Sequence, residues 1–138
     1  MATLGICLSL AAALQEAPAV FVPGTEFTLA WTHSIEKVRW EEDYAVRSDA
    51  VRGQPVLHAV QARVRGSAAG MEPPPDAVLR QGWYHYTPAI IKPPELRLTR
   101  SEFTPDYEVC MQGRCQPMAD WLPSDDGVTL LKACRHPG

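Results

Sequence analysis

Residues 31–44 read Trp31-Thr32-His33-Ser34-Ile35-Glu36-Lys37-Val38-Arg39-Trp40-Glu41-Glu42-Asp43-Tyr44, and this stretch decides the fold. Alternating side chains flank a short connection, a pattern typical of an antiparallel β-hairpin. With residues 35–38 as the loop, we expect His33 to face Trp40 and Trp31 to face Glu42. The apolar stripes of both strands then fall on one side of the hairpin, as a shared core requires.

Two ionisable side chains, His33 and Glu42, are predicted to share that apolar side. In the expected register they are diagonal neighbours, about 7–8 Å apart at Cα and within reach of each other's side chains. A carboxylate between Trp40 and Tyr44 loses hydration, which raises its pKa unless a cation or a donor compensates. The pair is either a structural ion pair near the rim of the sheet or the polar floor of a ligand pocket.

Short strand patterns fill the rest of the chain, separated by turns rich in proline and glycine. Thirteen prolines and nine glycines among 138 residues argue against long helices. We expect an all-β fold, a single antiparallel β-sandwich or partly open barrel of about eight short strands, forming one domain over residues 1–138. The expected strand Val56–Val64 would carry His58 on its inner face. The expected strands are Ile6–Leu14, Glu26–Ser34, Arg39–Arg47, Val56–Val64, Arg80–Tyr86, Leu96–Thr99, Tyr107–Met111, Cys115–Pro117 and Val128–Ala133.

Charge and hydropathy argue against nucleic-acid binding and against a membrane-spanning helix. The formal charge is −3 and the arginines are scattered among acids, so the sequence does not predict a basic surface for binding nucleic acid. No stretch approaches the roughly 20 apolar residues that a membrane-spanning helix needs. The apolar run from Leu4 to Leu14 precedes Ala17-Pro18-Ala19, which resembles a signal-peptidase site, but no Lys or Arg comes before it. A first strand from Gly5 to Leu14 is the favoured interpretation, and a cleaved signal is the alternative.

Four cysteines allow two disulfides. Gln112-Gly113 suits a two-residue turn, which would place Cys110 opposite Cys115 at a separation compatible with a disulfide. Cys7 would then remain for Cys134. Two alternatives stay open: four reduced thiols in a cytosolic protein, or a zinc site made by Cys110, Cys115, Cys134 and His136.

The segment from Arg65 to Met71 is a second candidate site. Its small residues would let the backbone approach a ligand, and consecutive N–H groups can hold an anion. It matches no phosphate-loop pattern, so it could equally be a simple turn. Catalytic motifs for hydrolases, zinc proteases and dinucleotide enzymes are absent from the sequence. The candidate ligand-binding residues are His33, Ser34, Glu36, Glu42, Arg65, Gly66, Ser67 and Gly70.

Several motifs resemble the bacterial family called domain of unknown function 1850. They are Phe27–Lys37 with Trp40-Glu41-Glu42, Arg65–Pro74, Gly82–Tyr86, and the pair Cys110 and Cys115. The resemblance implies an association with tripartite organic-anion transporters of the TRAP class, TAXI subtype. It therefore implies a TRAP-TAXI permease or binding protein as partner and a small organic anion as ligand.

The resulting expectation is a non-enzymatic accessory or small-ligand-binding domain without a cofactor. It would be periplasmic or peripheral to the membrane, with a cytoplasmic location as the alternative. The rival interpretations are a small hydrolase that uses His33 and Glu42 as base and acid, and the zinc-binding interaction domain.

Overall fold

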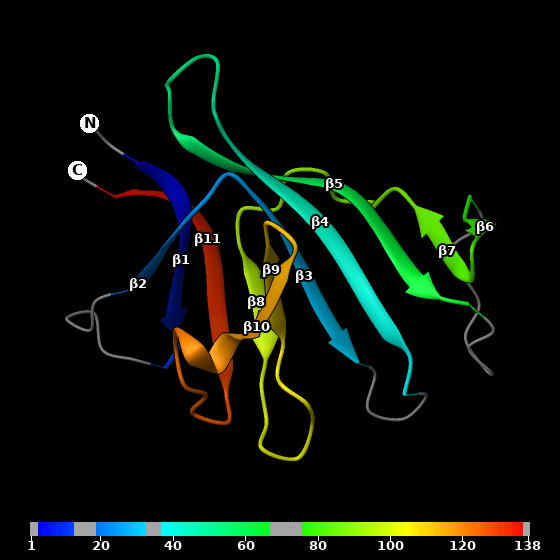
Figure 1. Ribbon diagram of the computed structural model, residues 1–138. Helices are drawn as coiled ribbons and strands as arrows, with labels where there is room; N and C mark the ends of the chain where they lie inside the picture. Colours follow the sequence, from blue (N-terminus) through cyan, green and yellow to red (C-terminus); the bar gives the residue numbers. More distant parts are fainter. Residues whose placement is uncertain (1–2, 13–18, 33–36, 67–75, 137–138) are drawn as a thin grey trace.

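The structure is a computed structural model that describes residues 3–12, 19–32, 37–66 and 76–136 (Figure 1). Its strands form two antiparallel sheets that do not close into a barrel, so the all-β sandwich prediction is confirmed. The four-stranded sheet has the order β2-β1-β11-β8, and the seven-stranded sheet has the order β10-β9-β3-β4-β5-β7-β6. The strands are β1 (Thr3–Leu10), β2 (Val20–Pro23), β3 (Glu26–Thr32), β4 (Arg39–Ser48), β5 (Pro55–Arg65), β6 (Val78–Arg80), β7 (Trp83–Tyr86), β8 (Leu96–Thr99), β9 (Glu108–Met111), β10 (Arg114–Pro117) and β11 (Val128–His136).

The core lies between the two sheets and follows the alternation of the strands. Ile6 and Leu8 of β1 and Leu131 of β11 face Leu29 and Val109 of the larger sheet, and all five are at most 1% exposed. Burying side chains of this size contributes roughly 1.5–3 kcal/mol each. In Figure 1 the long strands β4 and β5 run past the four-stranded sheet toward β7 and β6. That end of the seven-stranded sheet is where the candidate site lies.

The first and last strands pair along their whole length. Thr3 lies opposite His136 and Leu10 opposite Thr129, which confirms a first strand near the N-terminus, although it ends at Leu10. Gly5 is required there, because a Cβ at this position would overlap the backbone carbonyl oxygen of Val22 in β2 and would lie 2.8 Å from the Phe21 ring. The strand β2 is not among the strands expected from the sequence.

Both predicted disulfides are present. Gln112 and Gly113 form the two-residue turn, with φ values of 53° and 80°, and Cys110 is paired and bonded with Cys115. The second disulfide joins Cys7 of β1 to Cys134 of β11, whose Cα atoms are 5.9 Å apart. All four sulfur atoms are therefore engaged, and the Cys₃His zinc alternative with His136 lacks its thiolates.

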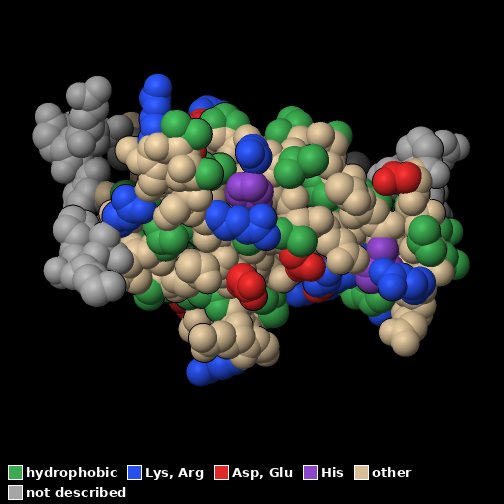
Figure 2. Space-filling model, turned by 90° about the horizontal axis from the view of Figure 1, so that it is seen from above, with side chains coloured by type: hydrophobic (Ala, Val, Ile, Leu, Met, Phe, Trp, Pro, Cys, Tyr) green, Lys and Arg blue, Asp and Glu red, His purple; other side chains and the backbone are tan. Residues whose placement is uncertain are grey.

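A bulge in β5 overturns the predicted position of His58. Asp43 lies opposite Gln61 but Tyr44 lies opposite Ala59, so Val60 is an extra residue that reverses the alternation. Leu57 and Ala59 are buried, whereas His58 faces outward. Burial and the positive charges of Arg47 and Lys92 lower the pKa of His58. Figure 2 shows histidine at the surface beside Lys and Arg side chains.

A short 3₁₀ helix, η1 (Met118–Asp120), follows β10. No helix among residues 3–12, 19–32, 37–66 and 76–136 has the length and hydropathy to cross a membrane.

Candidate functional site

Two rows of side chains on the inner face of the seven-stranded sheet build the site. The first row runs across five strands through Val109, Leu29, Glu42, Ala62 and Tyr86, and Glu42 is its only charged member. The neighbouring row contains Trp31, Trp40, Val64 and Tyr84. The pairing of these five antiparallel strands thus places one carboxylate within an aromatic surface. The name Glu42 cluster is used below for Trp31, Trp40, Glu42, Tyr44, Tyr86 and Tyr107.

The Glu42 carboxylate has one hydrogen-bond donor among the described residues. The Tyr44 hydroxyl donates to Glu42 Oε1 at 2.5 Å. Burial raises the pKa of Glu42 above its ordinary value, and the bond from Tyr44 opposes that rise. None of the ion pairs formed within the described part of the chain includes Glu42. The predicted loss of hydration is confirmed, and Tyr44 is the compensating donor.

Electrostatic effects spread from Glu42 to the tyrosines around it. Burial and the negative charge of Glu42 raise the pKa of Tyr86 to about 12, and they also raise the pKa of Tyr107. The pKa of Tyr44 rises for the same two reasons and because its hydroxyl donates to Glu42. All three hydroxyl groups therefore remain protonated near neutral pH and can act as donors.

Aromatic contacts fix the walls of the cluster. Trp31 and Trp40 stack with ring centroids 6.1 Å apart, and Tyr107 tilts against Trp31 at 5.9 Å. Tyr86 meets Trp40 at 6.5 Å with an interplanar angle of 83°, so these two rings form a corner. The Trp40 Nε1 donor is buried and has no acceptor among the described residues. An orphaned donor of this kind costs about 1–3 kcal/mol, so such atoms are rare unless they serve a function.

We expect Glu42→Gln to stabilise the protein at pH 8 but much less at pH 4. The raised pKa of Glu42 means that the protonated form is favoured in the folded state, so its contribution is present below the unfolded pKa of about 4.3. That contribution is lost as the pH rises through the folded pKa, because the carboxylate must ionise within the cluster. Glutamine stays neutral and still accepts the bond from Tyr44. Thermal unfolding of both proteins from pH 4 to pH 8 measures the difference, and a pH-independent difference would contradict the account.

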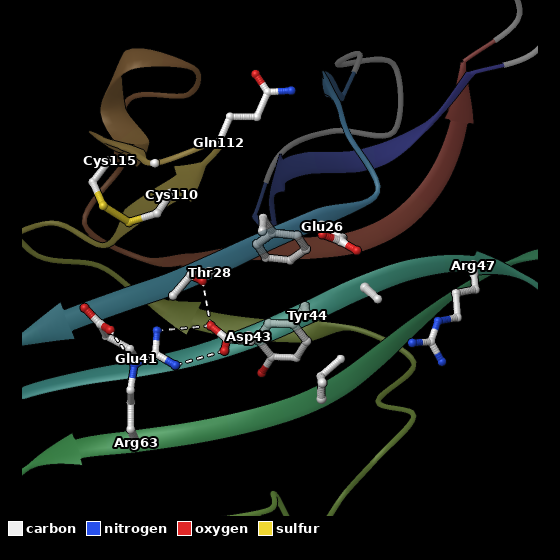
Figure 3. Close-up of a pocket in the computed structure, with 14 residues that line it drawn as sticks. Glu26, Thr28, Glu41, Asp43, Tyr44, Arg47, Arg63, Cys110, Gln112 and Cys115 are labelled. Carbon is white, nitrogen blue, oxygen red and sulfur yellow. Dashed lines mark hydrogen bonds and ion pairs between the residues drawn. A yellow bond between two sulfur atoms is a disulfide. The ribbon is translucent and has the colours of Figure 1, made fainter. Parts of the chain in front are cut away.

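The opposite face of the same sheet carries a shallow polar groove of about 610 Å³ (Figure 3). The charged side chains at the base of this groove pair with one another. Arg63 donates to Glu41 at 2.7 Å and to Asp43 at 2.9 Å, and the Thr28 hydroxyl donates to Asp43 at 2.6 Å. Arg39 continues this network to Glu41 and Glu108. The disulfide between Cys110 and Cys115 lies beside the groove (Figure 3).

Glu41 and Asp43 alternate with Glu42 along β4 and therefore point to this opposite face, where Arg63 holds both of them. The Glu41 side chain is only 17% exposed and is held by two arginines. Because its acids and bases are already paired, the groove offers few free groups to a ligand. On the other face of the sheet, by contrast, Glu42 has no ion-pair partner among the described residues.

The predicted site residues are only partly brought together. Glu42 lies on the inner face, whereas Arg65 lies on the outer side of β5 with its guanidinium 5.4 Å from the Trp83 ring centroid. The Gly66 N–H donates to the Gly82 carbonyl at 2.6 Å, so Gly66 closes the β5–β7 pair. The other predicted residues, His33, Ser34, Glu36, Ser67 and Gly70, lie outside the described residues.

The predicted hairpin register was wrong by two residues. Trp31 lies opposite Trp40, and Leu29 lies opposite Glu42. The place diagonal to Glu42 that the expected register gave to His33 is therefore occupied by Trp31. A shift of two residues keeps every side chain on its predicted face, which is why Glu42 was still placed correctly.

The aromatic residues of the cluster are not among the site residues predicted from the sequence. Trp31, Trp40, Tyr86 and Tyr107 belong to three separate parts of the chain, and only strand pairing brings them together. The signal available in the sequence was their position on the same side of their strands as Glu42. That signal was clear for Trp31 and Trp40 and weak for the tyrosines.

Comparison with known proteins gives one match. The family model described as domain of unknown function (DUF1850) matches residues 27–118, which contain β4–β10, all of β3 except Glu26, and every residue of the Glu42 cluster. No curated protein and no solved structure matches the chain.

Proposed function

The chain belongs to the DUF1850 family, and from this premise we propose that it is a non-enzymatic accessory domain that binds a small ligand at the Glu42 cluster. The observation that carries the proposal is the half-buried carboxylate of Glu42 within an aromatic surface, without a cationic partner among the described residues. Burying an ionisable group in this way costs stability. Such a cost is typical of a functional site.

The chemistry of the cluster supports binding better than catalysis. The cluster consists of indoles, phenols and one carboxylic acid. The raised pKa of the Tyr44 phenol makes it a poor nucleophile, and its proton is already donated to Glu42. Aromatic walls with a few fixed polar groups are the usual lining of small-molecule sites. This favours binding over the alternative of a hydrolase using His33 and Glu42.

The two disulfides support a location in an oxidising compartment such as the periplasm. A domain at that location is suited to work beside an uptake system. We therefore retain a TRAP-TAXI permease or its binding protein as the proposed partner.

Calorimetric titration with a panel of amines, amino acids and dicarboxylates tests the proposal. We expect at least one compound class to bind at a single site, and Glu42→Gln to weaken that binding at least tenfold, which corresponds to about 1.4 kcal/mol. Glu102→Gln is the matched control, because Glu102 is exposed and is not a member of the cluster. Absence of binding across the panel, or equal binding by Glu42→Gln, would refute a ligand site at Glu42.

A further inference from the structure

The Glu42 cluster presents one negative charge and several aromatic faces on neighbouring strands. Trp40 and Glu42 are two residues apart on the same face of β4, so their Cα atoms are separated by about 7 Å. Tyr86 lies in the same row as Glu42, with only Ala62 between them. The rings of Trp40 and Tyr86, which contact each other, therefore lie beside the carboxylate.

Each group of this corner favours the same kind of ligand atom. A carboxylate attracts a positive charge, and the attraction is stronger where burial has reduced the effective dielectric constant. The faces of Trp and Tyr rings attract cations through their quadrupoles, by about 0.5–2 kcal/mol for each contact. An anion would meet repulsion from Glu42 at the same place.

Within the part of the chain that the structure describes, no cationic side chain forms an ion pair with Glu42. The arginines nearest in the sheet, Arg39 and Arg63, point to the opposite face and are paired there with Glu41, Asp43 and Glu108. Arg65 is placed over Trp83 on the outer side. The raised pKa of Glu42 agrees with a carboxylate that lacks a charged partner.

We propose that the ligand of the Glu42 cluster is a small organic ammonium compound, whose cationic head lies against Trp40 and Tyr86 and pairs with the Glu42 carboxylate. This inference rests on the proposed ligand-binding function and specifies its ligand class. It differs from the organic anion that the resemblance implied. A zwitterion satisfies both requirements if its ammonium group is the end that enters the cluster.

A pair of probes with the same shape tests the charge requirement. Choline and 3,3-dimethylbutan-1-ol differ in that a trimethylammonium head replaces a neutral tert-butyl head, and succinate serves as the anionic probe. We expect choline to bind wild-type protein at least tenfold more tightly than the neutral alcohol. Glu42→Gln should reduce choline binding to the level of the alcohol, and Tyr86→Leu should reduce it severalfold. Glu102→Gln should leave the affinity for choline unchanged.

The outcomes separate this inference from the proposed function. Binding of succinate in preference to choline, with loss of that binding in Glu42→Gln, would overturn the ammonium ligand and keep the ligand site. Equal affinity for choline and the alcohol would also overturn it, because the site would then recognise apolar shape alone. Failure of all three probes and of the wider panel would overturn both proposals. Glu42→Gln is nearly isosteric and should fold, and circular dichroism verifies this.

Discussion

Replacing Cys7 and Cys134 together by alanine is expected to lower the free energy of unfolding by about 5 kcal/mol. The two residues are separated by 127 positions, so their bond closes a loop that contains nearly the whole chain. In the chain-entropy account, a cross-link of that length removes more freedom from the unfolded state than a short one. The bond also joins β1 to β11, the strands at the centre of the four-stranded sheet.

The second disulfide provides the matched control. Cys110 and Cys115 are separated by only 5 positions, and replacing both by alanine should cost about 2 kcal/mol. Urea unfolding of the two double variants under identical conditions measures the difference. Equal losses, or a larger loss for the short loop, would show that the bonds act through local strain or packing and not through the length of the loop.

The second large effect is expected from Asp106→Ala, which should destabilise the protein by about 3–5 kcal/mol. Arg100 is 2% exposed, and its guanidinium donates to both oxygens of Asp106, at 3.0 and 3.1 Å. Asp106 also accepts bonds from the backbone N–H groups of Tyr107 and Ala119. Removing the carboxylate would leave a buried positive charge without its partner and two N–H donors without an acceptor.

Two further variants serve as comparisons for Asp106→Ala. Asp106→Asn keeps an acceptor oxygen but removes the charge, so its loss should be smaller than that of Asp106→Ala. Glu95→Ala breaks ion pairs with Arg97 and Lys132, whose side chains are 61% and 52% exposed, and should cost less than about 1 kcal/mol. Chemical denaturation measures all three proteins. A loss for Asp106→Ala no greater than that for Glu95→Ala would contradict the structural role of the pair.

Alternation along the strands predicted which face each side chain occupies, and this was sufficient to find Glu42. Side chains in a strand repeat every two residues, so an error of two residues in register leaves the faces unchanged. The hairpin from Cys110 to Cys115 was predicted in detail, because Gln112-Gly113 specifies both the turn and the pairing that follows from it.

Features that depend on tertiary pairing could not be predicted from local patterns. The bulge at Val60 has no signature in the sequence, yet it turns His58 outward. The strand β2 is only four residues long and contains Pro23, so it resembles a turn until its pairing with β1 is known. Similarly, Arg100 was one of several scattered arginines until the fold placed Asp106 and Thr129 around it.

The pKa of the Glu42 carboxylate in the presence of an ammonium compound tests most directly whether the Glu42 cluster binds such a ligand. A nearby positive charge favours the ionised form. Nuclear magnetic resonance of the side-chain carboxyl carbon of Glu42, recorded across a pH series with and without saturating choline, reports this pKa. We predict a pKa above the ordinary glutamate value in the free protein and a clear fall when choline is bound. A pKa that choline leaves unchanged would contradict the assignment of this cluster as the binding site.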